Sequence, residues 1–166
     1  MKKIITILGT ITLIGTSTAS LVACNTPQYT EKELSDLKEK NNIKTKDGVL
    51  EWIAPQEKPF SQVDNKYYFV VWRGDKNAGW KIALFKFENT NVTNIDQYGK
   101  YIIQYSVKQG YNSGLMLVEK RNPGNVLIKR WEDDNKQEYF KSLYRWNNDS
   151  EPNIDVKNKL KSYLDL

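Results

Sequence analysis

The chain has 166 residues and a formal net charge of +5, and it contains one cysteine and no histidine. A single cysteine excludes an intramolecular disulfide, and the lack of histidine excludes Cys/His zinc sites and Cys–His or Ser–His nucleophile pairs. Any catalysis would have to rest on carboxylates, tyrosine or lysine with shifted pKa values. We therefore expect a protein that is not an enzyme and that has no metal site and no cofactor.

The first 24 residues have the layout of a bacterial lipoprotein signal, with a two-lysine start and an apolar run from Ile4 to Ile14. The segment ends in the lipobox sequence Leu21-Val22-Ala23-Cys24. In that pattern the bond between Ala23 and Cys24 is cut, and the cysteine thiol receives diacylglycerol. The pattern predicts a signal peptide over 1–23 and a lipoprotein of the cell membrane, held on its extracellular face by lipid on Cys24.

A transmembrane anchor is the alternative for this segment, because Ile4 to Ala23 is a run of 20 uncharged residues, close to the length that spans a bilayer. The glycine, serine and threonine residues of its second half are too polar for a strong span, and no stop-transfer cluster follows. We favour the lipoprotein. Either alternative leaves the lysines inside and exports the rest.

Residues 24–45 are predicted to form the lipidated cysteine, a tether and a polar helix. Thr30 and Glu33 have the T-x-x-E spacing of a capping box. Leu34 and Leu37 give this helix little apolar surface, which favours a solvated helix over a partner-binding one. Loss of the signal would lower the net charge to +3, a mild excess spread along the chain.

Residues 46–166 are predicted to form one globular domain rich in β structure. A short edge strand is expected over 49–53, and 66–72 is the strongest strand, apolar on both faces like a central strand covered on both sides. A turn over 73–79 and a returning strand over 80–87 predict a hairpin that brings Trp72 and Trp80 close enough to pair.

The second half of the domain predicts further hairpins. Residues 89–96 are expected to be a polar connection, and 100–107 alternates as a half-buried strand does. Strands over 115–120 and 126–131 flank Asn122-Pro-Gly-Asn125, a hairpin turn signal. The segment 138–146 suits a strand or a helix, and its aromatic content favours a strand.

A closing helix is expected over 154–164, with Val156, Leu160, Tyr163 and Leu164 on its buried face. A helix, six or seven strands in hairpins and a final helix predict an α+β fold with a mainly antiparallel sheet.

Four stretches resemble predicted surface lipoproteins of spiroplasmas, which are wall-less mollicute bacteria. They are the signal segment, DGVLEWIAPQEKPF, KYYFVVWRGDKN and KSLYRWNNDSEP. The resemblance covers most of the mature domain, and its signal part is shared among unrelated lipoproteins. It implies a location at the cell surface, facing the host or the medium, and it transfers no activity and no catalytic residue.

Arg73-Gly74-Asp75 is the tripeptide that integrins recognise, and it falls in a predicted hairpin turn. It is a candidate adhesion turn in a surface protein. Glycine and aspartate are also what such a turn needs for conformational reasons, and three residues recur by chance. We favour the turn alone.

Acidic side chains gather around another predicted turn: Glu132, Asp133, Asp134 and Glu138. The spacing from Asp133 faintly resembles a calcium loop, but it lacks the glycine at the sixth position and the glutamate at the twelfth. Paired carboxylates also permit glycosidase chemistry, although nothing in the sequence places two of them across a cleft. We favour a solvated turn without a metal.

Five tryptophans and many tyrosines could stack on sugars or on bases, but core packing explains most of them more simply. The diffuse charge argues against nucleic acid. The leading hypothesis is a lipid-anchored module that binds or adheres to a host surface protein or glycan. A small substrate-capture lipoprotein of a transport system is the alternative, and a carboxylate enzyme ranks last. The sequence does not fix the oligomeric state or the number of acyl chains.

Overall fold

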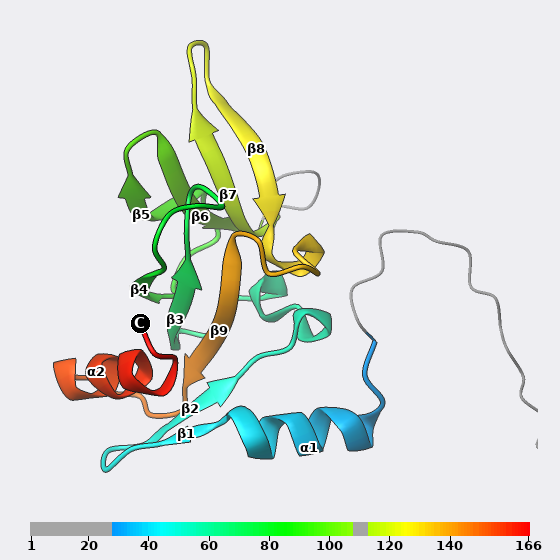
Figure 1. The fold of residues 1–166 in the computed structure, drawn as a ribbon, viewed down its shortest axis with the longest axis vertical. Helices are drawn as coiled ribbons and strands as arrows, with labels where there is room; N and C mark the ends of the chain where they lie inside the picture. The colour runs from blue at the N-terminus through cyan, green and yellow to red at the C-terminus, as the bar shows by residue number, and fades with distance from the viewer. Residues whose placement is uncertain (1–27, 108–112) are drawn as a thin grey trace, which may run out of the picture.

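The structure, a computed structural model, describes residues 28–107 and 113–166, which form two antiparallel sheets and two α-helices (Figure 1). The first sheet has the order β1-β2-β9-β3-β4, with β1 at Ile43–Lys44, β2 at Val49–Trp52, β9 at Phe140–Trp146, β3 at Tyr67–Trp72 and β4 at Lys81–Lys86. The second has the order β5-β6-β7-β8, with β5 at Thr93–Tyr98, β6 at Tyr101–Ser106, β7 at Gly114–Lys120 and β8 at Asn125–Arg130. The expectation of an α+β fold dominated by antiparallel strands is confirmed.

Strand β3 is buried on both faces, as its continuous apolar run predicts. Tyr68, Val70 and Trp72 enter a core that the two sheets share, which we call the inter-sheet core. Phe69 and Val71 point the other way, into a core beneath the C-terminal helix, which we call the helix-side core. Because side chains alternate along a strand, one segment supplies the centre of both cores.

The central strand of the first sheet is β9, formed by most of the segment whose sequence suits either a strand or a helix. It pairs with β2 on one side and β3 on the other. Leu143 enters the inter-sheet core, whereas Tyr144 and Trp146 enter the helix-side core. A strand buried on both faces loses the polar–apolar alternation that identifies strands, which explains the ambiguity.

Two expectations about the strands are wrong. Strand β5 occupies part of 89–96, expected to be a polar connection, and pairs with β6 at the edge of the second sheet. It is an edge strand with half its residues exposed, so its sequence carries little apolar signal. Trp72 pairs with Lys81 rather than Trp80, and the two indoles contact different cores.

The C-terminal helix α2 (Ile154–Tyr163) covers one face of the first sheet (Figure 1). It begins at the cap residue Asn153, whose side chain accepts hydrogen bonds from the backbone of Asp155 and Val156. Val156 and Leu160 are buried as expected. Tyr163 is 46 % exposed instead of buried, and its hydroxyl donates to the Lys40 carbonyl.

The N-terminal helix α1 (Glu31–Asn41) begins at the predicted capping box, because Thr30 and Glu33 bond to each other's backbone. None of its residues is fully buried. Just before it, the backbone of Tyr29 makes two hydrogen bonds with the Gln56 side chain, which fix the start of the domain. Within 28–107 and 113–166, no helix has the length and apolarity needed to cross a membrane.

Candidate functional site

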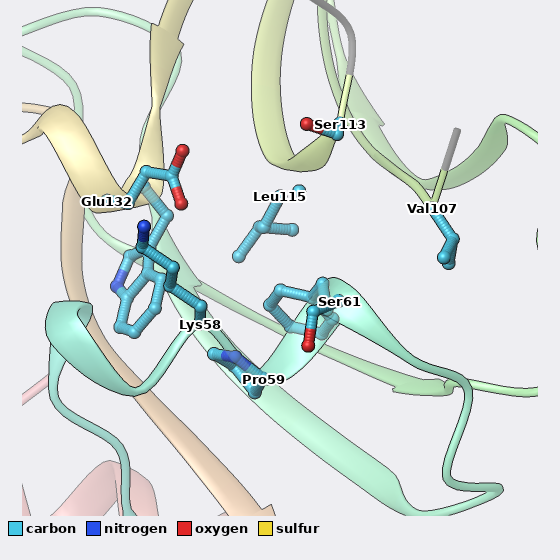
Figure 2. Close-up of a pocket in the computed structure, with 10 residues that line it drawn as sticks. Lys58, Pro59, Ser61, Val107, Ser113, Leu115 and Glu132 are labelled. Carbon is cyan, nitrogen blue, oxygen red and sulfur yellow. The ribbon is translucent and has the colours of Figure 1, made fainter. Parts of the chain in front are cut away.

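A cleft of about 320 Å³ opens at one end of the inter-sheet core, between three short segments that are distant in sequence (Figure 2). These are the 3₁₀ turn η2 (Pro59–Ser61), the facing ends of β6 and β7, and the 3₁₀ turn η3 (Trp131–Asp133). The volume lies at the lower end of the range of small-molecule pockets. It suits one apolar group of a ligand rather than a large molecule.

The floor of the cleft is apolar and fixed by packing. Phe60, Leu115 and Trp131 line it while being only 4 %, 2 % and 6 % exposed. The Phe60 ring lies 5.1 Å from the ring of Tyr68 and 5.2 Å from that of Phe87, centroid to centroid. Because both partners belong to the inter-sheet core, the floor is preformed.

The rim of the cleft carries charges of both signs. Lys58 and Glu132 lie on the same side of the opening, facing Val107 across it (Figure 2). Lys58 is exposed, and its backbone has left-handed angles (φ 45°, ψ 56°) between η1 (Pro55–Glu57) and η2. A lysine in that region is uncommon, and Pro59 disfavours the helical alternative for it. The arrangement suits an amphipathic ligand.

The four acidic residues singled out in the sequence serve different purposes. Glu132 lines the cleft, Asp133 is exposed, and Glu138 forms an ion pair with Lys76 at 2.9 Å. Asp134 is only 7 % exposed and accepts three backbone hydrogen bonds from the residues that lead into β9. The cluster is therefore a turn organised around one buried carboxylate, not a uniformly solvated one.

Hydrogen bonds and nearby positive charges lower the pKa of several carboxyl groups in the described part of the chain, which favours their ionised form. Hydrogen bonds and charge from Lys76 lower the pKa of Glu138, and those from Lys100 and Arg121 lower the pKa of Glu119. A general acid at neutral pH needs the opposite shift. Within 28–107 and 113–166 there is also no group of three acidic residues able to hold a metal ion.

Two of the three residues of the candidate adhesion turn, Arg73 and Gly74, make packing or hydrogen-bond contacts within the fold. The Arg73 guanidinium lies 4.3 Å above the Trp80 ring, and its Nε donates to the Glu138 carbonyl at 2.6 Å. Gly74 is buried, whereas Asp75 is exposed and its carboxylate accepts a hydrogen bond from the Asn77 backbone. All three residues therefore have a structural role in the turn.

Gly74→Ala is expected to lower the free energy of unfolding by about 1–3 kcal/mol, the usual cost of overpacking. A Cβ there would lie 2.5 Å from two ring carbons of Tyr101, closer than any stable contact. Gly79→Ala, in the same turn with open space around it, is the matched control and should cost less than about 0.5 kcal/mol. Urea unfolding of both variants measures the difference, and equal stabilities would contradict the contact.

The five tryptophans are all buried or half-buried. Trp72 and Trp146 are fully buried, so packing accounts for them. Trp131 lies on the cleft floor, and Trp52 and Trp80 are half-buried against the helix-side core.

Sequence analysis did not find the cleft. Lys58, Leu115 and Trp131 come from segments that share no motif, and a lysine between two prolines was the only local signal. The predicted cleavage and lipidation residues, Ala23 and Cys24, lie outside the described residues.

Comparison of the chain with protein-family models, with curated proteins and with solved structures finds no match.

Proposed function

We propose that the protein is a lipid-anchored binding module of the cell surface, which takes an apolar group of an extracellular ligand into the cleft. The observation that carries the proposal is the preformed apolar floor of Phe60, Leu115 and Trp131 beneath a rim with both charges. Such a site can bind without any catalytic group.

The lipobox supports the location. Tyr29 is fixed to the domain through Gln56, and it follows the predicted lipidated Cys24 by five residues. An extended chain spans at most about 3.3–3.6 Å per residue, so the fixed point would lie within roughly 17 Å of the anchor. The domain would stay close to the membrane and face outward.

The ligand class follows from the rim. Lys58 can pair with a carboxylate, and the floor takes an apolar side chain. The Glu132 carboxylate, which lies 3.9 Å from the Arg130 guanidinium, could accept a further hydrogen bond from an ammonium group. Apolar amino acids and short peptides carry these three features. Peptide capture for a transport system is therefore the second candidate, favoured by the small volume of the cleft.

A thermal-shift experiment on the full chain in mild detergent tests the cleft, with apolar amino acids and dipeptides such as Leu-Leu and Phe-Ala as probes. A probe at 100 times its Kd stabilises the folded state by about 2.7 kcal/mol, which should raise Tm by roughly 5–10 °C.

The paired substitution Lys58→Gln with Glu132→Gln should weaken binding of the same probe at least tenfold. Lys120→Gln with Glu151→Gln changes two exposed residues of the same charges and should weaken it less than twofold. If no probe raised Tm, or if both paired substitutions weakened probe binding equally, the cleft would not be the binding site. Binding of the chain to host cells but to no free probe would favour adhesion over substrate capture.

A further inference from the structure

A second hollow, on the other side of the first sheet from the inter-sheet core, gathers positive charge. It has a volume of about 300 Å³ and lies between β4, β5 and α2. Its lining residues are Trp80, Lys81, Ile82, Asp96, Lys157, Lys161 and Leu166. We call it the lysine hollow.

The three lysines of the hollow come from two elements and have no acidic ion-pair partner in the described part of the chain. Lys157 and Lys161 are four residues apart on α2 and so share one face of it, and Lys81 opens β4. None of the three takes part in an ion pair with another described residue. Like charges placed this way repel each other, and an anionic ligand would relieve that repulsion.

One carboxylate, that of Asp96, also lines the hollow, so the three lysines outnumber the acidic side chains there. Asp96 accepts hydrogen bonds from the Trp72 indole at 3.1 Å and from the Gln97 backbone at 2.8 Å. The Arg73 guanidinium lies 4.3 Å from the ring centroid of Trp80, a residue that lines the hollow.

Aromatic side chains accompany the charges. Trp80 forms part of the wall, and the Lys81 ammonium lies 4.0 Å from the centroid of the Tyr98 ring, which is 52 % exposed. Indole and phenol rings offer apolar faces to the C–H faces of sugars, whereas lysines bind carboxylate or sulfate groups. A nucleic acid needs a longer basic stripe that contacts many phosphates in succession. The geometry therefore fits an acidic sugar unit better than a nucleic-acid strand.

The position of the hollow argues for a soluble partner rather than the headgroups of the anchoring membrane. The N-terminal end of helix α1, which begins just after Tyr29, and helix α2 lie on opposite sides of the lower part of the domain (Figure 1). If the tether leads to the membrane from Tyr29, the hollow faces away from the anchor.

We propose that the lysine hollow binds acidic polysaccharide, sulfated or carboxylated, through Lys81, Lys157 and Lys161. The site is separate from the cleft of the proposed function. Its biological setting rests on the proposed surface location, but binding to the purified chain does not.

Calorimetry with a heparin hexasaccharide and the full chain in mild detergent, at physiological salt, tests the proposal. The variant Lys81→Gln, Lys157→Gln, Lys161→Gln should raise Kd at least tenfold and reduce the slope of log K against log salt by about two to three. The matched control Lys40→Gln, Lys120→Gln, Lys136→Gln removes three charges from exposed lysines elsewhere and should raise Kd less than twofold.

Any of the following outcomes would overturn the proposal: no heparin binding by the unmodified chain, equal losses in the two triple variants, or tighter binding to single-stranded DNA of equal charge or to anionic vesicles than to heparin. Each is distinct from failure of the cleft, which responds to Lys58 and Glu132 and not to these lysines. Tighter binding to anionic phospholipid vesicles than to heparin would assign the hollow to membranes instead.

Discussion

Asp134→Ala is expected to lower the free energy of unfolding by about 3–4 kcal/mol, because it leaves three buried or half-buried backbone N–H groups without an acceptor. In the native protein, one carboxylate oxygen accepts from Glu138 at 3.1 Å, and the other accepts from Tyr139 and Phe140 at 2.8 Å each. These bonds join η3 to the start of β9, the central strand of the first sheet.

Asp133→Ala is the control for this prediction, because the neighbouring residue carries the same charge but is exposed. It should change stability by less than about 0.5 kcal/mol. Asp134→Asn should fall between the two, since it keeps one acceptor oxygen. Chemical denaturation measures all three, and a cost for Asp134→Ala no greater than that for Asp133→Ala would show that the carboxylate does not organise the turn.

Cys24→Ser is expected to abolish labelling of the protein by radioactive fatty acid. The thiol is the only one in the chain, so no other cysteine can take the lipid. One acyl chain alone binds a membrane only marginally, so stable anchoring would need the two or three chains that lipoprotein modification supplies. The variant should retain its uncleaved signal segment.

Ser17→Ala, which lies in the same segment before the lipobox, should keep the label. Mass spectrometry of the membrane fraction gives the complementary result. A mature chain that begins at Cys24 supports the lipoprotein, whereas an unmodified chain that begins at Met1 supports the transmembrane alternative. Label retained by Cys24→Ser would contradict lipidation at this residue.

Local signals in the sequence were reliable where a few adjacent residues decide the structure. The capping box of Thr30 and Glu33 starts α1, and the turn after residue 120 joins β7 to β8. The apolar run of β3 marks a strand covered on both faces. These features depend on hydrogen bonds and steric preferences within one turn or strand.

Predictions from the sequence were wrong where contacts between distant segments decide how the strands pair and which residues are buried. Strand β5 is specified by its pairing with β6 at the sheet edge. Trp72 and Trp80 are separated because the strand register pairs Trp72 with Lys81. Both depend on register across strands, which the composition of one strand does not encode.

By itself, the sequence determined the α+β class, most of the strands and both helices. It also predicts a lipid-anchored surface protein. Tertiary structure alone decided where the candidate sites lie. The cleft unites Lys58, Leu115 and Trp131, and the lysine hollow unites Lys81 with Lys157 and Lys161. The net charge of +5 is spread along the chain, and only the packing of α2 against the first sheet brings Lys81 next to Lys157 and Lys161, which already share a helix face. Long-range contacts create a concave surface, so a site assembled from three or more segments has no counterpart in the linear sequence.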